Sequence, residues 1–187
     1  ELTHKHQALL IIDEVQTGIM RTGKYFAYQH FNITPDAITM AKALGNGIPI
    51  GALHVESKYA DLLQPGDHAS TFGGNFLATA VANKVLELIQ EPKFRQQILL
   101  LSDYLEDQLN KVQQTYPQLI HEVRGLGFMW GLVSDKAQQI AQGLFAKRVL
   151  STNIKGKVVR ILPPLISTKK EIDLFVTALH EVMRELS

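Results

Sequence analysis

The sequence contains no cysteine and only one tryptophan among its 187 residues. Because no disulfide bond can form, the sequence is not that of a small secreted fold held together by disulfides. Neither sign of charge is in large excess, since 19 basic and 18 acidic residues leave a formal net charge of +1. This balance provides no electrostatic basis for binding nucleic acid or an anionic membrane. No apolar run approaches the roughly 20 residues that a membrane-spanning helix needs. We therefore predict neither nucleic acid nor a membrane as a partner.

What the sequence does contain is typical of a globular protein, with 45% hydrophobic and 20% charged residues. The seven histidines show no metal-ligand spacing, so we predict no metal site. A cysteine-free chain suits the cytoplasm, which we predict as the location.

Short apolar runs alternate with helical patterns over the first part of the chain. We expect strands at residues 8–12, 37–41 and 52–55, and helices at residues 1–7, 21–31 and 76–90. The run 8–12 is wholly apolar, which is typical of a parallel strand buried on both faces. Asn75 is placed to cap the helix 76–90. This alternation predicts an α/β fold with a mainly parallel sheet.

The composition shifts near residues 115–117, after a predicted long amphipathic helix whose apolar residues run from position 94 to 112. Beyond the shift we expect strands near 128–133 and 157–162 and helices at 137–149 and from 169 onward. Thr168 and Glu171 form a capping box at the start of the last helix. We therefore predict two domains: residues 1–112 belong to a large α/β domain, and residues 113–187 form a small C-terminal α+β domain.

Asp13 and Lys42 each follow one of the expected strands, and Lys42 precedes a glycine-rich bend. Open α/β sheets bind ligands at the carboxyl ends of their strands. A pyridoxal 5'-phosphate (PLP) site needs a lysine amine that forms a Schiff base with the cofactor aldehyde. It also needs a carboxylate that pairs with the pyridine nitrogen. Taken singly, the lysine could equally be a surface charge and the aspartate a turn or helix-cap residue.

Four ordered blocks strengthen the PLP interpretation. They are Asp-Glu-Val-Gln-Thr-Gly at 13–18 with Arg-Thr-Gly at 21–23, the lysine block at 36–52, Pro-Gly-Asp-His-Ala-Ser-Thr-Phe-Gly-Gly-Asn at 65–75, and Val-Val-Arg-Ile-Leu-Pro-Pro-Leu at 158–165. Together they closely resemble class III PLP-dependent aminotransferases, and the third block is most similar to that of acetylornithine aminotransferases. The resemblance covers essentially the whole chain, which begins without methionine, and we expect it to correspond to the C-terminal half of such an enzyme.

The resemblance implies PLP fold type I, with PLP as the cofactor and Lys42 as the catalytic residue that holds it and shuttles a proton. It assigns four further residues to cofactor binding. Asp13 would pair with the pyridine nitrogen, Val15 would pack on a ring face, Gln16 would reach the ring hydroxyl side, and Glu14 would act through a network.

The third and fourth blocks imply residues at the phosphate and at the substrate. In the family, the threonine matching Thr71 contacts the cofactor phosphate of the neighbouring subunit, and the serine matching Ser70 lies near the substrate. This predicts a homodimer with shared active sites. Arg160 lies among apolar residues of its strand, where an unpaired charge is costly. The pattern alone allows a structural salt bridge, whereas the resemblance implies binding of the substrate α-carboxylate.

The implied reaction converts N-acetylornithine and 2-oxoglutarate into N-acetylglutamate semialdehyde and glutamate, in two ping-pong half-reactions through pyridoxamine phosphate. Its place would be arginine biosynthesis. Related class III activities on succinyl-diaminopimelate, ornithine or 4-aminobutyrate stay open, as does an inactive folded fragment. Two positions depart from the family pattern: Met20 stands where glycine is usual, and Phe76 stands where many members have proline.

Overall fold

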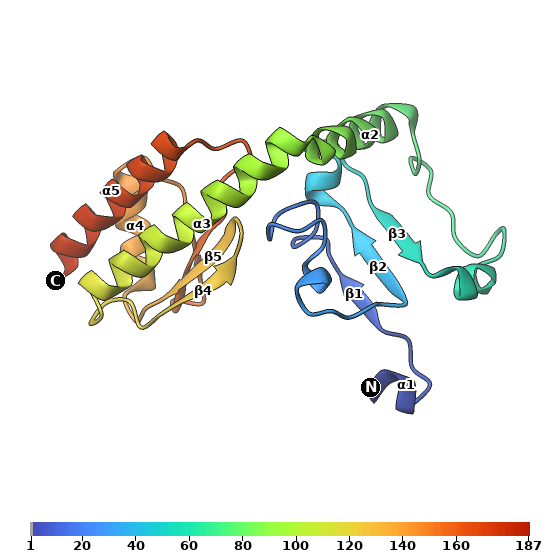
Figure 1. Cartoon of the computed structure of the whole chain (residues 1–187), viewed down its shortest axis with the longest axis horizontal. Coiled ribbons are helices and arrows are strands. Elements are labelled where there is room, and N and C mark those ends of the chain that lie inside the picture. The colour runs from blue at the N-terminus through green and yellow to red at the C-terminus, as the bar shows by residue number, and fades with distance from the viewer. Residues whose placement is uncertain (1) are drawn as a thin grey trace. The chain divides into compact units, whose positions relative to one another are not determined.

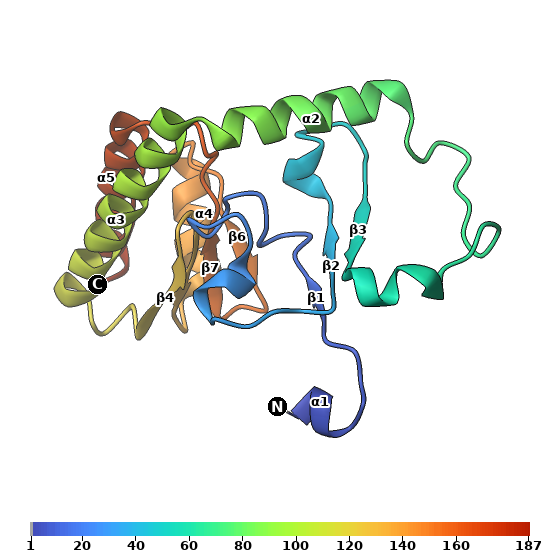
Figure 2. The ribbon, with the colours of Figure 1, turned by 45° about the vertical axis from the view of Figure 1, so that its right-hand side comes forward.

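The computed structural model describes residues 2–187, which divide into two compact units. The first unit ends at Phe94, and the second runs Arg95–Ser187. Figures 1 and 2 show the elements of each unit along the chain. The predicted domain boundary after residue 112 lies inside helix α3, Pro92–Thr115. The units divide earlier because the apolar residues of α3 pack in the core of the second unit. Residue 112 stays a prediction for the domain boundary of a complete enzyme.

A three-stranded sheet organises the first unit. Its strands are β1 (Ile11–Asp13), β2 (Ala37–Met40) and β3 (Ala52–Val55), in the order β1-β2-β3. The pair β1–β2 is parallel, whereas β2–β3 is antiparallel. The remaining helical elements are α1 (Leu2–Lys5), three 3-10 helices at Ala27–His30, Lys42–Leu44 and Ser57–Leu62, and α2 (Phe76–Gln90). In the parallel pair the carboxyl ends of both strands lie at the same end of the sheet.

The prediction that residues 8–12 are buried on both faces is wrong. Strand β1 begins only at Ile11, whose side chain is 58% exposed, and Leu9 is 43% exposed. Among the described strands β1 pairs with β2 alone, and the buried apolar residues Ala37 and Ile38 belong to β2.

The predicted helix over 21–31 is also wrong, since only Ala27–His30 is helical, as a 3-10 turn. Gly23 has a φ of +87°, which ends any right-handed helix before this turn. The backbone amides of Ala27 and Tyr28 instead donate hydrogen bonds to the carboxylate of Glu14. A long-range contact therefore overrides the local helical pattern.

Helix α2 confirms the sequence prediction at both ends. Asn75 precedes it, and the side-chain oxygen of Asn75 accepts a hydrogen bond of 2.9 Å from the amide of Ala78. Phe76 occupies the first helical position, the place where proline is favoured because its missing N–H has no partner in the helix. The departure at this position therefore leaves the cap intact.

A second sheet and three helices form the second unit. The sheet has the order β4-β5-β7-β6, and every pairing is antiparallel. Helices α3, α4 and α5 supply one hydrophobic core with the inner faces of β5 and β7, and Figure 1 shows them beside the strands. The element bounds are β4 Glu122–Leu126, β5 Met129–Val133, α4 Ala137–Ala146, β6 Thr152–Ile154, β7 Val158–Ile161 and α5 Lys169–Leu186.

The last helix and the two edge strands had very different sequence signals. The capping box of α5 is present, with Glu171 accepting from the Thr168 amide at 2.6 Å, and the apolar residues of α5 pack in the core. The edge strands β4 and β6 were not predicted. Neither strand has a run of apolar residues, and the place of each comes from backbone pairing with β5 or β7. Among residues 2–187, no helix is both long and apolar enough to cross a membrane, and no three acidic, histidine or cysteine side chains gather as a metal site.

Asp36 ties the start of β1 to β2 and to the segment after β3. Its carboxylate accepts a hydrogen bond of 2.8 Å from the Leu10 amide and forms an ion pair with Lys58, also at 2.8 Å. The Leu10 hydrogen bond and then Lys58 lower the pKa of Asp36. A lowered folded-state pKa stabilises the fold above the unfolded-state pKa of about 3.9, and this contribution is lost as the pH falls through the folded value.

We therefore expect Asp36→Asn to lower the urea midpoint at pH 7 by more than it does at pH 3. In acid the wild-type carboxyl group is itself becoming neutral, so the two proteins converge. Urea unfolding of wild type and variant at both pH values measures the difference. An equal gap at pH 7 and pH 3 would show that the charge of Asp36 does not matter.

Candidate active site

The carboxyl ends of β1 and β2 lie side by side at the same end of the first sheet. In the parallel register Asp13 lies opposite Thr39, and the Glu14 amide continues the ladder to the Thr39 carbonyl at 3.0 Å. Strand β2 ends at Met40, and Lys42 follows after one further residue. The structure therefore brings the Asp13 and Lys42 segments to the same edge, where open α/β sheets bind ligands.

The Asp13 carboxylate is exposed, and one of its two oxygens is held in place. Oδ1 accepts hydrogen bonds from the Val15 amide at 2.9 Å and from the Thr39 hydroxyl at 3.1 Å. Among the described residues, no group donates to Oδ2, so that oxygen can face a ligand. Sequence reasoning missed Thr39, because only the register between β1 and β2 shows that it lies opposite Asp13.

Glu14 lies directly beside Asp13 but is 1% exposed. Its carboxylate accepts from the Tyr28 amide at 2.9 Å, from the Ala27 amide at 3.1 Å and from the Thr17 hydroxyl. A buried carboxylate is tolerated where donors of this kind satisfy it. Direct cofactor binding by Glu14 stays a prediction, and these contacts favour an indirect role in which Glu14 holds the loop carrying Val15 and Gln16. Both of those residues are half-buried in the turn after β1.

The same loop contains two buried residues in the left-handed backbone region. Ile19 has a φ of +54°, and Met20 has a φ of +65°. Non-glycine residues are rare there, and a β-branched residue such as isoleucine is unusual. The left-handed φ accounts for the glycine that the family usually has at the Met20 position. In this chain the burial of the Met20 side chain, which is 1% exposed, offsets the backbone strain.

Lys42 is exposed and begins a short 3-10 helix with a φ of +46°. Its carbonyl accepts from the amides of Gly45 and Asn46 at 3.0 and 3.1 Å, which fixes the backbone in this uncommon conformation. Strained backbone of this kind clusters at functional sites, where the surrounding structure holds it. The amine makes no ion pair with any described residue, so it is free for covalent chemistry.

The loop before α2 carries the two predicted hydroxyl residues. Ser70 and Thr71 are both exposed. A cavity of about 720 Å³ lies between residues 49–53, just after Lys42, and the loop and helix residues 68–78. Ser70 lines this cavity, whereas Thr71 does not. Within one chain the structure thus brings Ser70, but not Thr71, against the segment that follows Lys42.

Arg160 lies in β7 of the second unit, opposite Gly131 of β5 and Thr152 of β6. Its neighbours along the strand, Val159 and Ile161, point into the hydrophobic core, so Arg160 is on the opposite face. The guanidinium Nε is buried and has no hydrogen-bond partner among the described residues. A buried donor without a partner is costly, and no ion pair of Arg160 with a described residue is present, so carboxylate binding by Arg160 stays a prediction.

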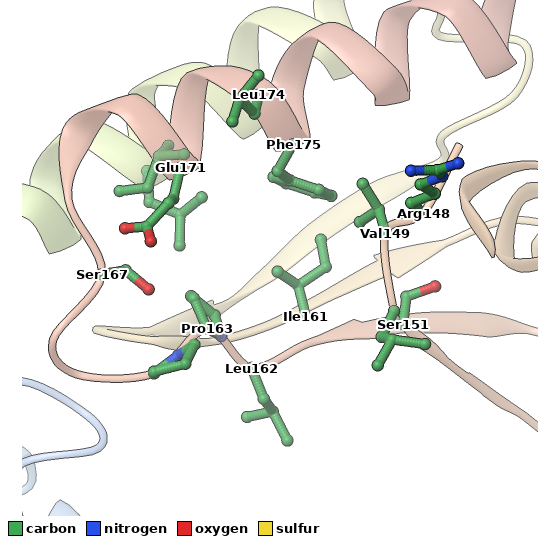
Figure 3. A pocket seen from close by; sticks show the side chains of 14 residues that line it. Arg148, Val149, Ser151, Ile161, Leu162, Pro163, Ser167, Glu171, Leu174 and Phe175 are labelled. Atoms are coloured by element: carbon green, nitrogen blue, oxygen red, sulfur yellow. The ribbon is translucent and has the colours of Figure 1, made fainter. Parts of the chain in front are cut away.

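A separate cavity of about 450 Å³ in the second unit lies on the core side of β7. Figure 3 shows its mainly apolar walls, which include Val149, Ile161 and Phe175, with Arg148 and Glu171 at its rim. Arg160 does not line it. This cavity is therefore distinct from the predicted carboxylate site.

The described residues fit PLP at the edge of the first sheet. The cofactor needs an amine for its aldehyde and a carboxylate oxygen for its ring nitrogen. Lys42 supplies the unpaired amine, and Asp13 supplies Oδ2 while Oδ1 is held by two donors.

Comparison with known proteins supports this chemistry. The chain is 45% identical over 177 residues to succinylornithine transaminase of Salmonella paratyphi A, covering 92% of this chain and 43% of the relative. It superposes on acetylornithine aminotransferase of Elizabethkingia anophelis with a TM-score of 0.89 and 34% identity, over 98% of this chain and 47% of the other. The ornithine aminotransferase of Toxoplasma gondii, with PLP at partial occupancy in its active site, matches with a TM-score of 0.89 and 33% identity, over 97% of this chain and 44% of the other.

These matches confirm the predicted fold class, and the chain spans less than half the length of the relatives it matches. Residues 1–183 match the family model described as aminotransferase class III. As the motifs predicted, the chain belongs to the class III aminotransferases, a family of PLP-dependent enzymes.

Proposed function

We propose that this chain carries the lysine and aspartate half of the active site of an aminotransferase that uses an N-acylated ornithine and 2-oxoglutarate. The observation that carries the proposal is that β1 and β2 end side by side, where no described residue donates to Asp13 Oδ2 or forms an ion pair with the Lys42 amine. When bound there, PLP supplies an electron sink for transamination.

Each predicted site residue would have a defined role. Lys42 Nζ holds the cofactor and then, once released, moves a proton at the substrate carbon that bears the amino group. Asp13 accepts a hydrogen bond from the protonated ring nitrogen and keeps it charged. Val15 packs on the ring face, Gln16 lies at the ring hydroxyl side, and Ser70 lies near the substrate. Arg160 binds a substrate carboxylate through its planar fork of donors.

Among substrates, we propose N-acetylornithine, giving N-acetylglutamate semialdehyde and glutamate, with a place in arginine biosynthesis and in the cytoplasm. The names of the relatives favour this group of substrates, since they act on succinylornithine, acetylornithine and ornithine. N-succinylornithine is the main rival, because the relative with that name is 45% identical.

The test is a pair of half-reactions followed by the visible absorbance of the cofactor in the enzyme that contains this chain. Glutamate should convert bound PLP to pyridoxamine phosphate, and 2-oxoglutarate should convert it back to PLP. Acetylornithine, succinylornithine, ornithine and 4-aminobutyrate are then compared by kcat/KM. A preference for 4-aminobutyrate would overturn the substrate proposal, and no conversion by any amine would overturn the proposed activity.

We also propose that the enzyme is a homodimer whose sites are shared through Thr71. Large apolar side chains flank this exposed threonine: Phe72 is 81% exposed, Phe76 92% and Leu77 66%. Contiguous exposed apolar residues mark interaction surfaces. A second copy of the chain, bound at this surface, would bring Thr71 to the phosphate of the partner's cofactor.

Mixing Lys42→Ala enzyme with Thr71→Ala enzyme is expected to restore activity. In a heterodimer with shared sites, both lesions fall in one site and the other site is complete. Equal mixing with free exchange should therefore make about a quarter of all sites complete. Activity and subunit exchange are measured together, with each variant alone as its own control. Full exchange without recovery would show that Thr71 does not act in the partner's site.

Arg160→Ala is expected to slow the glutamate half-reaction by roughly ten- to a hundredfold, the usual effect of losing hydrogen bonds to a charged group. Glutamate carries its carboxylate on the reacting carbon, whereas an acylornithine reacts at the far end of its chain. The acylornithine half-reaction should therefore suffer less. Arg160→Lys should be intermediate, because lysine keeps the charge without the planar fork.

Arg124→Ala is the matched control for this variant. Arg124 lies in the same cross-strand row, on the other side of Gly131, but is exposed and forms an ion pair with Glu122 at 3.6 Å. Arg124→Ala removes the same charge from the same face of the sheet, but it does not remove a buried Nε. Equal losses with glutamate and with an amine that has no carboxylate would mean that Arg160 is structural.

A further inference from the structure

We propose that Thr39 is a positioning residue for Asp13, and that its hydroxyl holds the carboxylate with Oδ2 directed to the cofactor nitrogen. The proposal rests on the proposed function, because it assumes that Asp13 is the partner of that nitrogen. Thr39 is not expected to touch substrate or cofactor itself.

The geometry isolates one oxygen of Asp13. The Thr39 hydroxyl donates to Oδ1 at 3.1 Å, and the Val15 amide donates to the same atom at 2.9 Å. Both hydrogen bonds go to the same oxygen, so rotation of the carboxylate is restrained and Oδ2 is left for a third donor. A carboxylate of PLP-binding type needs one free oxygen in a fixed direction, and two donors on the other oxygen provide it.

Thr39 also connects the two cofactor-binding segments. It makes a second bond to the end of β1, since its carbonyl accepts from the Glu14 amide at 3.0 Å. It lies in β2, three residues before Lys42. Thr39 therefore connects the strand that ends at Asp13 to the strand that precedes Lys42. A shift of either strand end would move the other.

The residue type suits this task. Threonine is β-branched, so few side-chain rotamers are open to it, and a half-buried strand position restricts them further. Valine has the same shape without the hydroxyl and is equally at home in a strand. Serine keeps the hydroxyl without the methyl group. This pair of substitutions separates the hydrogen bond from the packing.

The experiment uses the cofactor-loaded enzyme that contains this chain, with Thr39→Val, Thr39→Ser and, as reference, Asp13→Asn. The cofactor is labelled with ¹⁵N in its ring, and the ring-nitrogen chemical shift reports its protonation. The dissociation constant of the cofactor, kcat, KM and the melting temperature are measured on the same samples.

For Thr39→Val we expect a ring-nitrogen shift displaced toward that of Asp13→Asn, a weaker cofactor affinity and a kcat lowered roughly tenfold, in line with a hydrogen bond to a charged group. KM and the melting temperature should change little, and Thr39→Ser should restore the wild-type shift. A wild-type shift and kcat in Thr39→Val would overturn the proposal. So would equal losses in the valine and serine variants, because packing would then be the cause.

Asp13→Asn distinguishes an error in the role of Thr39 from an error in the role of Asp13. If Asp13→Asn displaces the ring-nitrogen shift and Thr39→Val does not, only the role of Thr39 is wrong. If Asp13→Asn leaves the shift unchanged, the proposed role of Asp13 is wrong, and the role of Thr39 falls with it.

Discussion

Replacing Lys42 with alanine is expected to reduce transamination roughly a thousandfold or more, as loss of a covalent catalytic residue does in other enzymes. Lys42 is the amine proposed to hold the cofactor, so the covalent bond to the cofactor and the proton transfer are both lost. The fold should persist, because the Lys42 amine forms no ion pair with a described residue. Turnover, cofactor content and thermal unfolding of the variant measure these outcomes.

Two further proteins sharpen the Lys42 experiment. Lys42→Arg keeps a positive charge but cannot form the covalent bond, so it should be as inactive as the alanine variant. Lys24→Ala is the matched control, since Lys24 is an exposed lysine of the same unit whose amine donates to the Gln29 carbonyl at 2.9 Å. Reduction of the loaded enzyme with borohydride should label the peptide that contains Lys42. A label on Lys24 or Lys58 would overturn the assignment.

Replacing Asp13 with asparagine is expected to slow transamination by roughly 10²–10³-fold, the range seen when one preorganised electrostatic partner is removed. The variant loses the negative charge that keeps the ring nitrogen protonated. It retains a side-chain carbonyl oxygen, which can still accept from the Val15 amide and the Thr39 hydroxyl. The geometry of the strand ends should therefore survive, and single-turnover rates with glutamate measure the loss of charge alone.

The control for Asp13 is another carboxylate of the same unit. Asp36→Asn also neutralises an aspartate, but one that joins Leu10 and Lys58 away from the edge residues. It should reduce stability without an effect of this size on the single-turnover rate. A near-normal rate in Asp13→Asn, with the cofactor bound and the fold intact, would remove Asp13 from the mechanism.

Local signals in the sequence were sufficient for several elements and for the family. Asn75 and the Thr168–Glu171 box cap helices through residues at most three positions away, and the apolar stripe of α5 repeats at helical spacing. The order of the motifs pointed to class III aminotransferases. Signals of this kind depend on near neighbours in the chain, so they can be read before the fold is known.

Where distant segments compete with a local pattern, the sequence was misleading. Residues 21–31 have a helical pattern, yet their amides at Ala27 and Tyr28 serve the buried Glu14 carboxylate. Residues 8–12 are apolar like a buried strand, yet Leu9 and Ile11 are exposed in this chain. Burial and long-range hydrogen bonds are properties of the assembled sheet, which no short window of sequence contains.

By itself, the sequence predicted the family and its PLP chemistry, from a lysine and an aspartate after two strands in motifs that belong to one family. Only the tertiary structure decided how the aspartate is held, because the pairing of Asp13 with Thr39 depends on the register of two strands separated by more than twenty residues. It alone also showed that the Arg160 Nε is buried without a partner among the described residues, since burial depends on every element around β7. Residue types set which reaction is possible, and the register and packing of distant segments set the directions in which those residues point.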